Sequence, residues 1–267
     1  MARGYLTTVN ESKFNNFRKD MDKIVELCQT QTIPPKVRRF IRMYECGLPL
    51  DTTVRYYPAS KFDEIEQRVK ELITGGKEVW VSIALPEEAS EASVQTPPRI
   101  PPITSLEIYH QQAIHMIQAL PPNSWVKVYF ETFREMTCIV IRISNDPSVD
   151  RREVLVEVWF HEYDLKEAVK RIPDWRLFCG SETNFFWKLQ DNADLKKAHF
   201  SLLKKIFGYD GRHRHAVARI ANIEKCRTIA FEFKALPASN FFIDYERIGP
   251  RDPRHTFDWL YYLRHGE

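Results

Sequence analysis

The chain has 267 residues, of which 43% are hydrophobic and 13% aromatic, so it has enough apolar material for a packed core and wholesale disorder is excluded. Its formal net charge of +3 is too small to indicate a polyanionic partner by itself. No apolar run approaches the roughly 20 residues that cross a bilayer, the N-terminus has no apolar signal core, and the five cysteines form no CxxC or Cys/His cluster. We therefore expect an intracellular protein with no membrane segment, no zinc site and no disulfide framework.

The N-terminal part, residues 1–85, is predicted to be mostly helical. Apolar residues recur at helical spacing in residues 11–28, and a second helix is expected from Val37 to Cys46, where Gly47 ends it. A third helix is expected over residues 61–73, before an isolated strand, VWVSIAL. No catalytic constellation occurs here, so this region is either a small helical domain or an element that docks on a partner.

Residues 86–103 are predicted to be a linker. Small polar residues, acids and two Pro-Pro pairs cannot bury enough surface to fold, and Pro-rich segments stay extended. The domain that follows is expected to span residues 104–267.

Three antiparallel strands are predicted between Ser124 and His161, where aromatic and β-branched runs are separated by turn-forming residues. Alternation assigns their side chains to two faces. The first face is apolar and consists of Val126, Val128, Phe130, Ile139, Ile141, Ile143, Val154, Val156 and Val158. The second mixes cations with aromatic rings and consists of Lys127, Tyr129, Cys138, Arg142, Glu157, Trp159 and His161. Such a face suits single-stranded nucleic acid, although an ordinary meander with one solvated face has the same pattern.

A short amphipathic helix should precede these strands, and further helices are expected over residues 163–171, 192–205 and 252–263. Later strands are expected around Ile206–Tyr209 and in the runs HAVARIANI and RTIAFEFKA. The predicted fold class is therefore α+β: a five-stranded OB-type Greek-key barrel after a mostly helical N-terminal region. Nine cations and only two acids lie between Leu195 and Arg227, whereas elsewhere acids and bases interleave as on solvated faces.

The order of these motifs resembles the second OB fold of the protection-of-telomeres family, the telomere end-binding proteins. The resemblance covers residues 104–264 and rests on SW before a strand, then MTCIVI, LVEVW, FGYDGRHRHA and IAFEF. It implies a nuclear protein at chromosome ends that binds the single-stranded, G-rich telomeric overhang and limits access of telomerase and repair enzymes. It implies no cofactor and no enzymatic activity, and the N-terminal helices could then contact a telomeric protein partner.

The same resemblance implies individual binding residues. Tyr209 and Phe133 fall where the family stacks rings on bases, Asp210 would accept a hydrogen bond from a base edge, and Lys234 would contact a phosphate. The second face and the cation-rich segment from Leu195 to Arg227 add aromatic rings for base stacking and cations for phosphate neutralisation. The full set of predicted nucleic-acid contacts is Tyr209, Asp210, Phe133, Lys127, Tyr129, Arg142, Trp159, Arg212, Arg214, Arg219 and Lys234.

Two alternatives stay open at the level of sequence. Asp210, followed 22 residues later by Glu232-Phe233-Lys234 in an apolar run, matches the arrangement of Mg²⁺-dependent PD-(D/E)xK nucleases. An OB fold can also serve as a protein-interaction module, with an interface patch of Trp175, Phe185, Phe186 and Trp187. Mg²⁺-dependent cleavage distinguishes the first alternative from simple binding.

Overall fold

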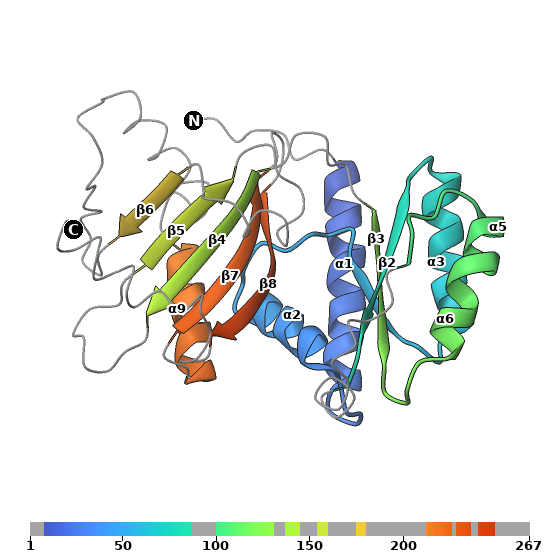
Figure 1. Ribbon diagram of the computed structural model, residues 1–267, viewed down its shortest axis with the longest axis horizontal. Coiled ribbons are helices and arrows are strands. Elements are labelled where there is room, and N and C mark those ends of the chain that lie inside the picture. The colour runs from blue at the N-terminus through green and yellow to red at the C-terminus, as the bar shows by residue number, and fades with distance from the viewer. Residues whose placement is uncertain are drawn as a thin grey trace. The chain divides into compact units, whose positions relative to one another are not determined.

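The computed structural model describes residues 8–86, 100–130, 137–144, 154–159, 175–179, 212–225, 228–235 and 240–248. The chain forms two compact units, each with its own sheet (Figure 1). The first unit comprises Met1–Ile41 and Asp51–Thr132, and the second comprises Arg42–Leu50 and Phe133–Glu267. The short segment 42–50 therefore belongs with the C-terminal part of the chain, from which it is distant in sequence.

The helices predicted for the N-terminal part are confirmed as α1 (Thr8–Leu27), α2 (Pro35–Glu45) and α3 (Phe62–Thr74). Helix α1 buries Phe17, Met21 and Ile24, which recur at the spacing of one helix face. Gly47 ends α2 with a φ of +79°: its N–H donates to the Tyr44 carbonyl at 2.9 Å, and the Leu48 N–H donates to the Met43 carbonyl at 3.0 Å. This pair of bonds is a Schellman motif, which requires a left-handed residue where the helix stops.

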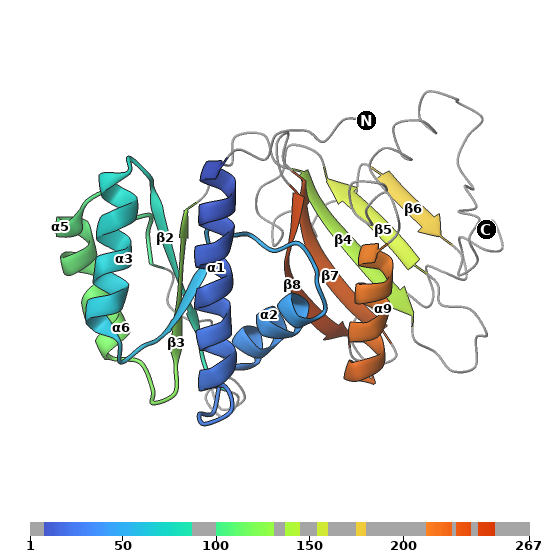
Figure 2. The same cartoon turned by 180° about the vertical axis from the view of Figure 1, so that it is seen from behind.

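The sheet of the first unit consists of β1 (Arg55–Pro58), β2 (Val79–Ala84) and β3 (Trp125–Phe130), in the antiparallel order β1-β3-β2. The strand predicted as isolated is β2, and it pairs with β3 along its whole length. Helix α3 and the continuous helical segment α5 (Leu106–Ile108), η1 (Tyr109–Ala113) and α6 (Ile114–Gln118) cover one face of this sheet, while α1 lies on the other (Figures 1 and 2). Their shared core includes Val69, Val128 and Ile117, each at most 1% exposed.

The second unit contains a five-stranded antiparallel sheet in the order β6-β5-β4-β7-β8. Its strands are β4 (Thr137–Ser144), β5 (Val154–Trp159), β6 (Trp175–Cys179), β7 (Thr228–Ala235) and β8 (Asn240–Ile248). The register puts the predicted apolar residues of β4 and β5 opposite one another, for example Ile141 opposite Val156 and Phe231. Helix α9 (Arg212–Glu224) lies against one face (Figure 2), where the His213 and Phe242 rings meet at 6.5 Å.

The predicted OB barrel is wrong. The run expected to be its first strand is β3, which pairs with β1 and β2 in the other sheet. Within the described residues, the edge strands β6 and β8 are not paired with each other, so the five-stranded sheet is open. The order of hydrophobic runs along the chain predicted that strands would form but could not determine which sheet each one joins, because pairing is decided by tertiary contacts.

Two elements of the second unit differ from the sequence prediction. The run HAVARIANI lies in helix α9 and is not a strand: Ala216, Val217, Ile220 and Ala221 are buried on one helix face. Alanine favours a helix, and this i, i+1, i+4, i+5 spacing fits a helix better than the alternation of a strand does. Strand β8 was not predicted from the sequence. The helices expected over residues 163–171, 192–205 and 252–263 lie outside the described residues.

Segment 42–50 is attached to the second unit by backbone and side-chain contacts. The Phe242 N–H of β8 donates to the Pro49 carbonyl at 2.7 Å, and Leu50 forms a parallel bridge with Phe242. Arg42 at the end of α2 forms an ion pair with Glu224 of α9, and the Tyr245 hydroxyl donates to the same carboxylate at 2.5 Å. Burial and this hydrogen bond raise the pKa of Tyr245, so its hydroxyl stays protonated and continues to donate.

Candidate functional site

The predicted nucleic-acid contacts are divided between the two units. Lys127 and Tyr129 belong to β3 of the first unit, where Lys127 is only 7% exposed and its ammonium lies 4.4 Å from the centre of the Tyr129 ring. The cation and the ring thus contact each other, which is a favourable arrangement for a largely desolvated ammonium group. Phe133, Tyr209, Asp210 and the second-face residue His161 lie outside the described residues.

Three of the predicted contacts come together on the open sheet of the second unit. The register pairs Cys138 of β4 with Trp159 of β5 on one side and with Lys234 of β7 on the other. Arg142 lies four residues further along β4, and strand alternation assigns it to the same face as Cys138. This face is the one opposite α9, because Phe231 and Tyr245, whose rings lie 5.4 Å apart on the α9 side, alternate with Glu232 and Asp244.

The same face also carries carboxylates, which were not expected there from the sequence. Glu232 of β7 pairs with Asp244 of β8, and one row of the sheet runs Arg176, Glu157, Val140, Glu232, Asp244. Asp244 is 8% exposed, and its Oδ1 accepts a 2.8 Å hydrogen bond from the Tyr245 N–H. The face is therefore mixed in charge, in contrast to the cationic face expected from β4 and β5 alone.

The remaining predicted cations, Arg212, Arg214 and Arg219, belong to helix α9, whereas the sequence predicted a strand at Arg219. Arg219 is exposed, and its charge acts on the Cys46 thiol: burial raises the pKa of Cys46, while Arg219 opposes this rise. His213 packs its ring on Phe242. No group of three histidine, cysteine or acidic residues among the described residues is arranged to hold a metal ion.

The described residues of the first unit form a charged cleft. It has a volume of about 700 Å³ and lies between α1, β1 and α3. Its ten lining residues are Asn16, Lys19, Asp20, Asp22, Lys23, Glu26, Arg55, Tyr57, Arg68 and Glu71. The lining contains four cations and four carboxylates, so its formal charges sum to zero.

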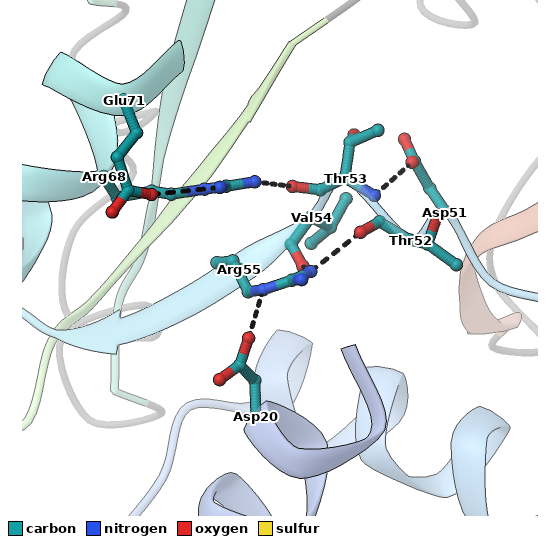
Figure 3. A network of polar contacts seen from close by, with 8 residues as sticks. All are labelled: Asp20, Asp51, Thr52, Thr53, Val54, Arg55, Arg68 and Glu71. Atoms are coloured by element: carbon teal, nitrogen blue, oxygen red, sulfur yellow. Dashed lines mark hydrogen bonds and ion pairs between the residues drawn. The ribbon is translucent and has the colours of Figure 1, made fainter. Parts of the chain in front are cut away.

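Arg55 anchors one side of this cleft (Figure 3). Its Nε donates to Asp20 Oδ2 at 2.6 Å, and its Nη1 donates to the carbonyls of Thr52 and Val54, each at 2.8 Å. The guanidinium also lies 5.3 Å from the centre of the Phe17 ring. Burial lowers the pKa of Arg55, and the Asp20 carboxylate opposes that change. Arg55 thus ties the residue 51–54 loop and α1 together.

Arg68 is held much less firmly than Arg55. Its Nη1 lies 3.4 Å from Glu71 Oε2, and its Nη2 donates to the Thr53 carbonyl at 3.3 Å, both long for hydrogen bonds (Figure 3). Its Nε is buried and has no hydrogen-bond partner. Burial raises the pKa of the neighbouring Tyr57 to about 12, although Arg68 and Arg55 act in the opposite direction. Tyr57 is therefore a neutral hydroxyl beside two cations.

This cleft was not predicted from the sequence, because its charged residues have the pattern of ordinary solvated faces. Arg55 and Asp20 are 35 positions apart, and Arg68 reaches across 15 positions to Thr53. The one local signal was Arg55, which starts a short strand and is followed by Tyr56 and Tyr57. A charged residue beside aromatic residues in a strand needs a partner if it becomes buried.

Neither a family model nor a curated protein matches the chain. Several solved structures resemble it weakly. A macrocyclase, MdnC, bound with precursor peptide MdnA from Microcystis aeruginosa MRC has a TM-score of 0.44 and 10% identity, covering 97% of this chain and 68% of that one. A dinucleotide-forming acetyl-coenzyme A synthetase 1 from Ca. Korarchaeum cryptofilum has a TM-score of 0.45 and 13% identity, covering 86% and 97%.

A third is a phosphoribosylglycinamide synthetase from Anaerococcus prevotii, with a TM-score of 0.37 and 9% identity, covering 77% of this chain and 40% of that one. This chain thus spans less than half the length of that enzyme. Because these TM-scores are below 0.5 and the identities are at most 13%, we transfer neither fold nor activity from them. No helix within the described ranges is long and apolar enough to span a membrane.

Proposed function

We propose that the protein binds single-stranded nucleic acid on the face of its five-stranded sheet that lies opposite α9. The observation that carries the proposal is the register row in which Cys138 lies between Trp159 and Lys234, with Arg142 further along β4. An aromatic residue and cations from three different strands thus share one face. A base that stacks on such a ring gains roughly 1–3 kcal/mol, and cations beside the ring neutralise the phosphates.

The carboxylates of this face set a condition on binding. Glu232 and Asp244 lie opposite each other, but Asp244 is buried whereas Glu232 is half-buried, so a phosphate chain that crosses this row meets chiefly the Glu232 carboxylate. Like charges repel, so a nucleic acid avoids this row or binds with a divalent cation between phosphate and carboxylates. A nucleic acid that crosses this row should therefore bind more tightly with Mg²⁺, in contrast to the weakening that any added salt causes by screening.

Fluorescence anisotropy with a G-rich strand, its C-rich complement and the duplex tests the proposal. We expect single strands to bind more tightly than duplex, and Trp159→Ala to weaken binding by about 10-fold or more, as loss of one stacking platform predicts. Lys234→Gln should weaken binding of all sequences and reduce the salt dependence by about one phosphate contact. Lys61→Gln, which changes an exposed cation of the first unit, is the matched control. Equal affinity of wild type and both sheet variants would contradict the proposal.

A second function is favoured by one further observation, namely that Glu232 faces Asp244 and lies two residues before Lys234 in the same strand. Two carboxylates can hold Mg²⁺, and a nearby lysine can assist an attacking water molecule in phosphodiester hydrolysis. Asp210, which the sequence analysis placed in the same site, lies outside the described residues. Mg²⁺-dependent cleavage of the labelled strand that disappears in Glu232→Gln supports this function, and binding without cleavage rejects it.

The telomeric role is more specific than this proposal and stays a prediction. It was inferred from a resemblance to an OB fold, and the open sheet removes that structural basis. The nuclear location and a telomeric partner for the N-terminal helices depend on the same resemblance. A preference for G-rich telomeric repeats over scrambled strands of equal composition, measured in the same anisotropy experiment, decides whether the finer assignment holds.

A further inference from the structure

We propose that the charged cleft between α1, β1 and α3 binds a small zwitterionic ligand that carries a carboxylate and an ammonium group, of the class of a free amino acid. The volume of about 700 Å³ falls within the range of small-molecule sites. All lining residues belong to the first unit, so this inference is independent of the nucleic-acid face on the sheet of the second unit.

Arg68 is the residue that would receive the ligand carboxylate. Its side chain is 20% exposed, both of its existing contacts are 3.3–3.4 Å long, and its buried Nε has no hydrogen-bond partner. A buried donor without an acceptor is costly, and an arginine presents paired N–H groups that match the two oxygens of a carboxylate. A carboxylate in the cleft would pair with the terminal Nη1 and Nη2 groups of Arg68 and replace the weak contact to Glu71.

Arg55 plays a different part, although it lines the same cleft. Its Nε and Nη1 already donate to Asp20 and to two backbone carbonyls at 2.6–2.8 Å. It therefore fixes the wall of the cleft. Tyr57, whose pKa is raised to about 12 by burial, offers a neutral hydroxyl next to both guanidinium groups and can donate to the same ligand carboxylate.

The wall formed by α1 determines the ligand class. Lys19, Asp22, Lys23 and Glu26 are exposed on this helix and contribute two cations and two carboxylates to the lining. A phosphate-rich anion that reaches Arg68 would meet the carboxylates of α1 and of Glu71, whereas a ligand with an ammonium group gains from them. The balance of four cations and four carboxylates thus favours a zwitterion over a polyanion.

The test is isothermal titration calorimetry of the 267-residue protein with each of the common free amino acids. Acetate, ethylamine and inorganic phosphate serve as probes of the carboxylate, the ammonium group and anions in general. We expect at least one amino acid to bind, acetate and ethylamine each to bind at least about 10-fold more weakly, and phosphate not to compete. Absence of binding by any amino acid, or tighter binding of phosphate, would overturn the proposal.

Variants assign the binding to the cleft. Arg68→Gln should abolish binding of the amino acid, and Glu26→Gln should weaken the amino acid while leaving the affinity for acetate unchanged. Lys61→Gln is the matched control, because Lys61 lies just before the same helix as Arg68 and forms an exposed ion pair with Glu64 outside the cleft. If Arg68→Gln does not fold, Glu26→Gln on the exposed side of α1 keeps the test decisive. Unchanged amino-acid affinity in Glu26→Gln would contradict the ligand class.

Discussion

At the scale of single residues, burial distinguishes charged groups that stabilise the fold from charged groups on the surface that contribute little to its stability. Arg55 and Lys61 both form ion pairs in the first unit, but the Arg55 side chain is 10% exposed and that of Lys61 is 54% exposed. The Lys61 pair with Glu64 is screened by water, and such pairs contribute little. Sequence patterns treat the two cations alike, and only the structure shows that Arg55 supplies donors to a loop.

The expected consequence is a large difference between two similar substitutions. Arg55→Met removes the partner of Asp20 and leaves the carbonyls of Thr52 and Val54 without their donor. We expect it to lower the free energy of unfolding by about 1–3 kcal/mol, the cost of unpaired polar groups that are partly buried. Lys61→Met should change it by less than about 1 kcal/mol. Urea unfolding of both variants measures the difference, and equal values would show that Arg55 has no structural role.

At the scale of elements, the three N-terminal helices were predicted from sequence far better than sheet membership, whereas α9 was expected to be a strand. Helices α1, α2 and α3 follow from apolar residues at helical spacing, and α2 and α3 also from the glycines after them, all of which are local signals. Strand β3 carries the same alternation whether it pairs with β1 and β2 or with β4, so its sequence could not reveal its sheet. Strand β8 includes Asp244 and Glu246 among its residues, and this polar content concealed it.

The C-terminal end of α2 at Gly47 gives a prediction at the scale of elements. Gly47 has a φ of +79°, and no atom lies within 4 Å of the position that a Cβ would occupy. Gly47→Ala therefore tests the backbone conformation without a steric clash, and we expect a loss of about 1–2 kcal/mol, the cost of a left-handed residue with a Cβ atom. Gly47→Asn should be milder, because asparagine tolerates this conformation. Thermal unfolding ranks the variants, and alanine as stable as glycine would contradict the assigned helix end.

At the scale of the whole molecule, the chain does not divide into consecutive domains. Segment 42–50 belongs to the unit that otherwise begins at Phe133, and strand β3 belongs to the unit built from N-terminal elements. Loop closure between such distant segments costs entropy before any contact forms, so buried contacts must offset that cost. Local sequence patterns do not indicate which unit segment 42–50 or strand β3 joins. The candidate cleft and the register of the open sheet both arise from such distant pairings, and for that reason neither was predicted.

Leu50 offers a test of this organisation. It is 8% exposed and bridges to Phe242 of β8, although 192 positions separate the two residues. Leu50→Ala should remove about 2–3 kcal/mol from the stability of the second unit, as expected for truncation of a buried leucine. Hydrogen exchange followed by mass spectrometry should then show faster exchange in β7 and β8, while α3, whose Ile65 and Val69 are fully buried in the first unit, keeps its protection. Faster exchange in α3 alone would mean that segment 42–50 stabilises the first unit, contrary to the division of the chain described above.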